Sequence, residues 1–222
     1  MATLNIAAKR NYLEIKRMLS YLTNPKILVI GGGGRRYGYG IASLGKHLID
    51  RAINLELEKG PLVSVISDAH HLPTKDSVFD CVIVQAVLEH IVEPDIVVSE
   101  IYRVLKPGSI VYAEIPFMQG YHAAPDDYRR FTISGLRRLF SHFMEIKLGI
   151  CCGPSSTVTW VMQEYLATVF SFNIKILYKI LSKILGWMLF PLNYIDLVIT
   201  RYETSINIAS ALFFLGKKRD DK

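Results

Sequence analysis

The stretch Ile27-Leu28-Val29-Ile30-Gly31-Gly32-Gly33-Gly34 decides the fold that this sequence predicts. Its four apolar residues are typical of a buried strand, and the glycines let the backbone turn sharply and approach a ligand closely. A helix that follows such a turn directs its free N–H groups at the ligand. Glycine runs also end strands in α/β proteins that bind nothing, so this stretch alone predicts a sheet and a tight turn.

Two acidic residues follow the glycine run at informative distances. Glu56 lies 25 residues past Gly31, inside the short apolar run 53–57. A carboxylate at the end of the second strand of such a sheet can accept hydrogen bonds from both hydroxyls of a ribose. Asp68 follows another apolar segment, and the run 79–84 has the pattern of a buried strand. This order of parts predicts that the chain binds an adenosine-containing cofactor.

Three later segments narrow this interpretation. Residues 68–73 read Asp-Ala-His-His-Leu-Pro, residues 88–90 read Leu-Glu-His, and residues 103–108 read Arg-Val-Leu-Lys-Pro-Gly. Together with the glycine run they resemble the class I S-adenosylmethionine-dependent methyltransferases, in particular the type 11-like group. The resemblance covers roughly residues 25–150 and a last strand near 206–216. It implies an α/β fold with a doubly wound, mostly parallel, seven-stranded Rossmann-like sheet, an antiparallel last strand, and S-adenosylmethionine as the cofactor.

The resemblance also implies a set of cofactor-binding residues. The two glycines would lie against the methionine part, the glutamate would hold the ribose, and the aspartate with its alanine neighbour would meet the adenine edge. The glutamine would contribute to the methionine pocket, and the leucine would pack near the adenine or ribose. These residues are Gly31, Gly33, Glu56, Asp68, Ala69, Gln85 and Leu88. Two positions depart from the family pattern, because Val29 replaces the usual acidic residue and Arg35 replaces the usual third glycine.

The segment 116–131 is the predicted acceptor side. It leaves the carboxyl end of a strand, where open α/β sheets place their ligands. Methyl transfer is an in-line displacement, so positioning supplies much of the rate and a base is needed only if the acceptor must lose a proton. We expect His122 to be that base and Tyr128 and Asp126 to orient the acceptor. The alternative is that Asp126, Asp127 and Arg130 form a hydrogen-bond network at a helix entry, with His122 facing solvent.

Residues 154–204 form an unusually apolar insertion between strands six and seven of the predicted sheet. Lys175, Lys179 and Lys183 recur every four residues and therefore share one face of a helix. The apolar run 184–192 is too short to span a bilayer. The insertion is expected to be a helical lid over the acceptor pocket, a homodimer interface, or a peripheral membrane contact through residues 173–192. Its aromatic residues favour a small-molecule or lipid-like methyl acceptor.

Composition fits one domain over residues 1–222. The formal charge is +6, but the basic pairs are scattered and lack aromatic interleaving, which argues against nucleic acid as a partner. The three cysteines give no disulfide framework and no zinc-site spacing, so no metal site is predicted. The first residues lack the apolar core of a signal peptide. We therefore expect a cytoplasmic protein, with the inner membrane surface as a second location.

Beyond the sheet residues already named, the apolar patterns predict further elements. Only residues 58–61 separate the second strand from the apolar run 62–66, so whether that run pairs as a third strand is left open. Predicted helices cover residues 8–22, 39–51, 95–105 and 132–143, and predicted strands cover 26–31, 53–57, 80–84, 109–115, 144–150 and 207–216.

The predicted function is S-adenosylmethionine-dependent methyl transfer. A nicotinamide-dependent oxidoreductase would also use a glycine loop and an acid on the second strand, but it gives Asp68 and the Leu-Glu-His segment no role. A non-catalytic module that binds an adenosyl cofactor or a membrane is the other alternative, because Val29 removes an acid that the family usually has.

Overall fold

The computed structural model describes residues 4–32, 40–122 and 126–220. These residues contain a seven-stranded sheet in the order β3-β2-β1-β4-β5-β7-β6. All neighbouring strands are parallel except β7, which runs antiparallel to both β5 and β6. This confirms the predicted doubly wound sheet with an antiparallel last strand. The strands are β1 (Ile27–Ile30), β2 (Ile53–Glu56), β3 (Val65–Ile66), β4 (Phe79–Gln85), β5 (Leu105–Pro116), β6 (Phe143–Cys152) and β7 (Ala211–Lys218).

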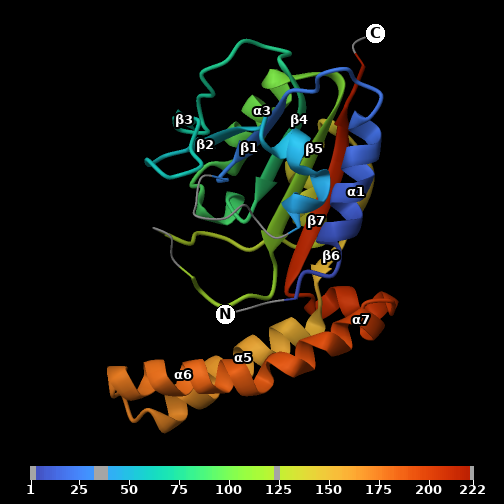
Figure 1. The fold of residues 1–222 in the computed structure, drawn as a ribbon. Coiled ribbons are helices and arrows are strands. Elements are labelled where there is room, and N and C mark those ends of the chain that lie inside the picture. Colours follow the sequence, from blue (N-terminus) through green and yellow to red (C-terminus); the bar gives the residue numbers. More distant parts are fainter. Residues whose placement is uncertain (1–3, 33–39, 123–125, 221–222) are drawn as a thin grey trace.

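Helices cover both faces of the sheet (Figure 1). On one face lie α1 (Ala8–Leu19), the 3-10 turn η1 (Ile41–Leu44) and α2 (Lys46–Ile49); on the other lie α3 (Pro94–Val104) and α4 (Ile133–Leu139). Successive strand residues point to opposite faces, so Ile27 and Val29 join the core under α1, whereas Leu28 and Ile30 join the core under α3. Burial on both faces explains why β1 and residues 81–84 of β4 are continuous apolar runs.

The run 62–66 does pair, as a two-residue edge strand. Leu55 pairs with Val65 and Glu56 with Ile66, in parallel register. The short connection has no helix; instead, the Ser64 N–H donates to the Asn54 carbonyl at 2.8 Å and the Asn54 N–H donates to the Ser64 hydroxyl at 3.1 Å. A loop can therefore replace the usual crossover helix because the strand that it delivers is so short.

Several predicted boundaries are wrong by a few residues. The predicted helix 39–51 is broken, because Gly45 has φ +91° and separates η1 from α2. The predicted strand 207–216 begins only at Ala211, since the residues before it form the 3-10 turn η4 (Glu203–Ile208). The predicted helix 132–143 ends at Leu139. Thr132 caps its start, its hydroxyl accepting the Gly135 N–H at 3.1 Å.

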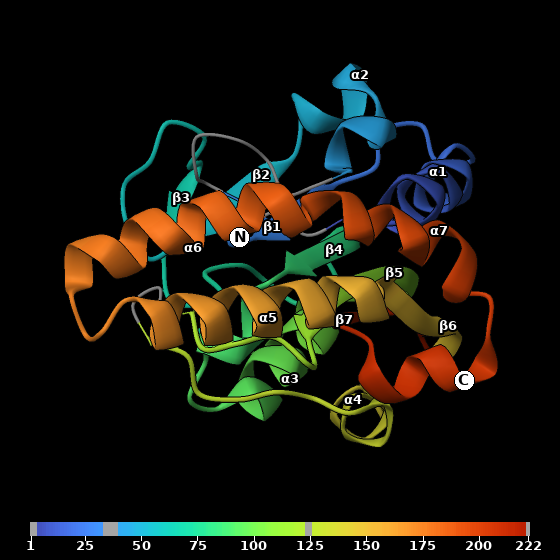
Figure 2. The same ribbon diagram turned by 90° about the horizontal axis from the view of Figure 1, so that it is seen from below.

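A helical hairpin separates β6 from β7 in the chain. It consists of α5 (Pro154–Phe170) and α6 (Lys175–Leu189), and it continues through the 3-10 turn η3 (Phe190–Ile195) into α7 (Asp196–Ile199). We call α5 and α6 the α5–α6 hairpin. Figures 1 and 2 show its two helices side by side, outside the layers of the sheet and across the end where β5 stops and β7 starts. The hairpin therefore lies on the side of the sheet where ligands are expected.

One buried carboxylate attaches the base of the hairpin. Asp196 is fully buried and accepts hydrogen bonds from the Ser155 and Ser156 N–H groups, at 2.7 and 3.1 Å, and from the Ser156 hydroxyl at 3.0 Å. These N–H groups belong to the first turn of α5, where a negative charge is favoured. The Thr159 hydroxyl donates to the Asn193 side chain at 2.9 Å. Polar contacts therefore join α5 to the segment that follows α6.

Candidate active site

A cavity of about 220 Å³ opens at the carboxyl ends of β1, β2 and β4. Gly31 begins its rim with φ +76°, and a Cβ at this position would lie 2.1 Å from Cγ2 of Val87. Only glycine fits both the left-handed backbone and this close approach. The lining residues are Ile30, Gly31, Leu55, Glu56, Leu57, Ser67, Asp68, Ala69, Ala86, Val87, His90 and Ile91.

Four of the seven predicted cofactor residues line this cavity together: Gly31, Glu56, Asp68 and Ala69. The backbone N–H of His70, and then its imidazole, lower the pKa of Asp68, so this carboxylate is ionised and only accepts hydrogen bonds. An acceptor of this kind suits the exocyclic amine of adenine. The roles of these residues in cofactor binding remain predictions.

The other three predicted cofactor residues lie elsewhere. Gly33 falls outside the described residues. Leu88 is fully buried in the core under α3 and is not part of the cavity lining. Gln85 ends β4, but its side chain belongs to a polar network on the α1 side of the sheet, where its amide donates to Glu114 at 2.5 Å and its carbonyl accepts the Tyr12 hydroxyl at 3.3 Å.

That network centres on Glu114, a buried acid that sequence patterns did not single out. It accepts hydrogen bonds from the Asn5 amide at 2.8 Å and the Tyr112 hydroxyl at 2.5 Å as well as from Gln85. Burial raises the pKa of Glu114, and the three donors act in the opposite direction. Because its members come from the N-terminal segment, α1, β4 and β5, the network fixes the N-terminal helix against the carboxyl ends of the central strands.

The loops after β4 and β5 meet in a cluster of three titratable side chains. Nε2 of His90 lies 3.8 Å and Nε2 of His122 lies 3.7 Å from the same Glu89 carboxylate oxygen. Glu89 is fully buried, and its carboxylate raises the pKa of His122, while the imidazole's own partial burial lowers that pKa. Trp160 of α5 packs on His122 with ring centroids 5.7 Å apart. We call Glu89, His90 and His122 the Glu-His-His cluster.

A second network holds the loop that carries His122. The Arg130 guanidinium makes two hydrogen bonds to the Asp127 carboxylate, and these hold the pKa of Asp127 well below its ordinary value. Asp127 in turn accepts the His122 N–H at 2.8 Å, and Arg130 donates to the Gly120 carbonyl at 2.8 Å. The sequence left open a helix-entry network of Asp126, Asp127 and Arg130 with His122 facing solvent. The structure contains the part of this network between Asp127 and Arg130, and His122 is half-buried.

Tyr128 and Asp126, which were predicted to orient the acceptor beside His122, do not contact the His122 side chain among the contacts of the described residues. Tyr128 is 51% exposed, and its hydroxyl donates to the Asp126 carboxylate at 3.2 Å. Neither side chain belongs to the Glu-His-His cluster; Asp126 touches it only through its backbone carbonyl, which pairs with Nδ1 of His90. The catalytic roles of His122, Tyr128 and Asp126 remain predictions. Sequence analysis missed Glu89; the only pattern that could have indicated this residue is the Leu-Glu-His segment at 88–90, which resembles the family.

Comparisons with known proteins concern a segment of the sequence and the fold. Residues 39–113 match a family model described as a methyltransferase domain. The ubiquinone/menaquinone biosynthesis C-methyltransferase UbiE of Haemophilus ducreyi is 41% identical over 49 residues, which are 22% of this chain and only 19% of that protein. The matched segment is similar to methyltransferase domains, as the motifs of this chain predict, and the solved structures below share its fold.

Solved structures share the fold at low sequence identity. Phosphoethanolamine N-methyltransferase 2 of Haemonchus contortus, in complex with S-adenosyl-L-methionine, has a TM-score of 0.58 and 18% identity over 95% of this chain and 53% of that chain. The 1,6-didemethyltoxoflavin-N1-methyltransferase of Burkholderia thailandensis, with bound S-adenosylhomocysteine, has a TM-score of 0.54 and 15% identity over 96% and 79%. The [4+2]-cyclase SpnF also has this fold, with a TM-score of 0.55 and 17% identity over 95% and 81%.

Proposed function

We propose that this protein transfers the methyl group of S-adenosylmethionine to a small-molecule acceptor. The observation that carries the proposal is the cavity at the carboxyl ends of β1, β2 and β4. Its rim joins a glycine turn to two acidic residues, Glu56 and Asp68, which come from different strands and loops. Glu56 offers acceptors to the ribose hydroxyls and Asp68 to the adenine amine.

For methyl transfer, the protein mainly has to position the acceptor and the cofactor. The acceptor's lone pair attacks the methyl carbon, the carbon–sulfur bond breaks, and its electron pair stays on sulfur as the neutral thioether of S-adenosylhomocysteine. Holding the two reactants in line supplies most of the rate. The loop after β4 borders the cavity through His90, and His90 packs on His122 of the loop after β5. The acceptor is therefore expected on the side of these loops, near His122.

Calorimetric titration with S-adenosylhomocysteine and, separately, with NAD tests this proposal. We expect one-to-one binding of S-adenosylhomocysteine and no binding of NAD. Binding of NAD alone would favour the oxidoreductase alternative. Binding of neither compound would favour a non-catalytic module and would contradict the proposal.

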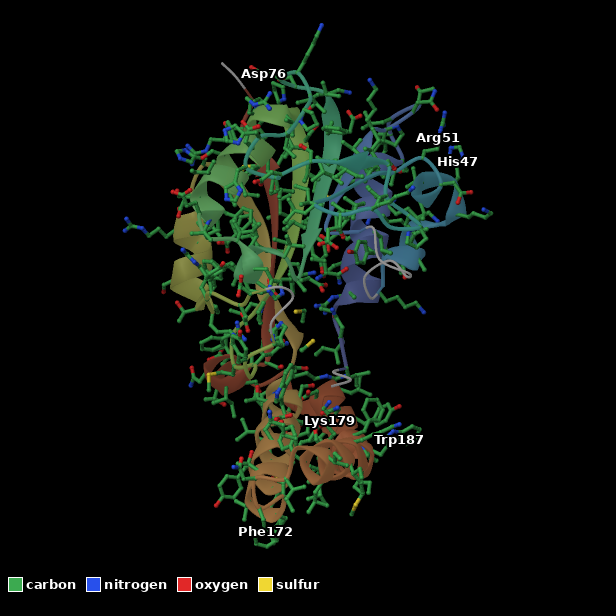
Figure 3. All side chains as sticks on the ribbon, turned by 90° about the vertical axis from the view of Figure 1, so that its left-hand side faces the viewer. His47, Arg51, Asp76, Phe172, Lys179 and Trp187 are labelled. Atoms are coloured by element: carbon green, nitrogen blue, oxygen red, sulfur yellow. The ribbon has the colours of Figure 1, made fainter. Side chains whose placement is uncertain are left out.

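The α5–α6 hairpin supports a finer proposal, that the acceptor is lipid-like and is reached at a membrane surface. Large apolar side chains on the hairpin are exposed, among them Phe172 at 77% and Trp187 at 78%; Figure 3 shows Phe172 on the side of the hairpin away from the sheet and Trp187 at its lateral edge. Exposed apolar patches of this extent mark interaction surfaces. Both side chains are too exposed to be the part of the hairpin that covers an acceptor pocket.

The charges of the hairpin favour a membrane surface over a second copy of the chain. Lys175, Lys179 and Lys183 lie along α6, and α6 contains no acidic residue to pair with lysines of a partner copy. By length and composition alone, Lys175–Ile199 is one stretch able to cross a membrane. The repeated lysines and Pro191 fit better with a hairpin that lies in the interface, its apolar side chains among acyl chains and its lysines at anionic headgroups.

Co-sedimentation with anionic vesicles tests this part of the proposal. The wild-type protein should pellet with phosphatidylglycerol vesicles, and the double variant Phe172→Ser with Trp187→Ser should stay in solution. A matched control, Leu57→Ser with Tyr21→Ser, removes exposed apolar side chains outside the hairpin and should still pellet. A wild-type protein that stays in solution while light scattering reports a dimer would instead make the hairpin a dimer interface.

A further inference from the structure

The Glu-His-His cluster has a geometry that neither hydrogen bonding nor packing accounts for. Neither carboxylate oxygen of Glu89 has a hydrogen-bond partner among the described residues, although the side chain is fully buried. An ionised carboxylate without partners is costly to bury. Two imidazole nitrogens face it at 3.7 and 3.8 Å, beyond the usual 2.7–3.2 Å of a hydrogen bond.

The opposite edges of both imidazole rings are held by backbone carbonyls. Nδ1 of His90 lies 2.5 Å from the Asp126 carbonyl, and Nδ1 of His122 lies 3.0 Å from the Gly120 carbonyl. A carbonyl can only accept, so each Nδ1 carries a proton, and Nε2 of each ring is the nitrogen that faces Glu89. Histidines that bind metals are oriented in this way, by an Nδ1–H bond to a carbonyl or carboxylate.

The distances fit ligands of one ion. Ligand atoms of the three residues all lie within 4.8 Å of one another. Atoms bound at about 2.1 Å to a tetrahedral ion are about 3.4 Å apart. The two imidazole–carboxylate separations, 3.8 and 3.7 Å, exceed this value by a few tenths of an ångström, and the two imidazoles would have to approach each other to complete the site. The nearest other charge, Arg130, lies 3.3 Å from Nδ1 of His122, on the edge away from Glu89, and it is paired with Asp127.

We propose that Glu89, His90 and His122 bind a divalent transition-metal ion of the Zn²⁺ class. Two imidazoles and one carboxylate are a donor set for such an ion, with at least one position left open.

The position of the cluster adds an expectation that rests on the proposed methyl transfer. His90 lines the cavity proposed for the cofactor, so an ion held by the cluster would lie beside that cavity. Its open position would take an oxygen of the acceptor, which makes the acceptor a hydroxyl compound. When bound, the ion would make this hydroxyl lose its proton to water more easily, and Glu89, His90 and His122 would hold the ion and so position the oxygen.

Metal titration of the purified, EDTA-dialysed protein tests the site. Calorimetry with ZnCl₂ should show one site in the wild-type protein and a loss of affinity of at least about 100-fold in Glu89→Gln and in His122→Gln, since each loses a direct ligand. His47→Gln, which removes an exposed histidine on α2 (Figure 3), is the matched control and should bind like the wild type. Circular dichroism checks that each variant folds.

S-adenosylhomocysteine binding is measured on the same samples and separates the two proposals. Retained S-adenosylhomocysteine binding with no Zn²⁺ site in the wild type would overturn the metal proposal and leave methyl transfer standing. Equal Zn²⁺ binding by the wild type, Glu89→Gln and His122→Gln would also overturn it, because the ion would then be bound elsewhere. Loss of Zn²⁺ in only the two cluster variants would support it, whatever S-adenosylhomocysteine does.

Discussion

At the scale of single residues, buried carboxylates determine how the site is held. Glu114, Glu89 and Asp196 are all buried, yet their surroundings differ. Glu114 and Asp196 each accept three hydrogen bonds, whereas Glu89 faces two imidazole nitrogens without accepting one. The first two therefore have a structural explanation, and Glu89 is the residue whose environment calls for a cation.

The raised pKa of Glu114 predicts a pH dependence of stability. A carboxyl group whose pKa is higher in the folded than in the unfolded state stabilises the fold below its unfolded pKa, and this contribution is lost as pH rises through the folded pKa. Glu114→Gln removes that titration. Urea unfolding between pH 4 and pH 8 should therefore show the free energy of unfolding of Glu114→Gln improving relative to wild type as pH rises. Parallel pH profiles would contradict the prediction, because they would mean that the three donors cancel the effect of burial on the pKa of Glu114.

At the scale of elements, the sequence predicted those strands and turns that depend only on neighbouring residues. The runs 27–30 and 79–84 are apolar on both faces, so they could only be central strands, and the glycine that ends the first run has the close approach expected of it. The start of β7 was misplaced because Ile206 and Ile208 are apolar in a 3-10 turn as they would be in a strand. A run of apolar residues predicts that a segment is buried, but it does not distinguish a 3-10 turn from a strand.

Only part of the candidate site was predictable from the sequence, namely the residues that line the cavity. The cofactor residues Gly31, Glu56 and Asp68 follow strands whose order the pattern gives, and they line one cavity. Glu89 and His122 are 33 residues apart and meet only because the loops after β4 and β5 converge. No spacing in the sequence reports such a contact, so the cluster emerged from the structure.

The attachment of the α5–α6 hairpin gives a prediction at this scale. Asp196→Ala leaves the Ser155 and Ser156 N–H groups buried without their acceptor, so we expect a loss of about 1.5–3 kcal/mol in the free energy of unfolding. Urea denaturation measures it, and faster proteolysis within the hairpin should accompany it. Asp50→Ala, which removes only an exposed ion pair with Lys46, should cost less than about 1 kcal/mol. Similar losses in both variants would show that Asp196 does not anchor the hairpin.

At the scale of the whole molecule, the two surfaces proposed to be functional lie on the same side. The cofactor cavity and the Glu-His-His cluster occupy the carboxyl ends of the strands, and the α5–α6 hairpin lies across that end (Figure 1). Trp160 connects them, because it belongs to α5 and packs on His122. A hairpin resting on a membrane would thus present the acceptor side of the site to that membrane.

The affinity of S-adenosylhomocysteine for Glu56→Ala is the most direct test of the central claim, that the cavity beside β1 and β2 holds the cofactor. Losing the acceptor for two buried ribose hydroxyls should weaken binding by about 1–3 kcal/mol relative to wild type. Glu58→Ala, an exposed acid two residues further along the chain that does not line the cavity, should bind like wild type. Calorimetry that finds equal affinities in all three proteins would contradict the account and move the ribose site elsewhere.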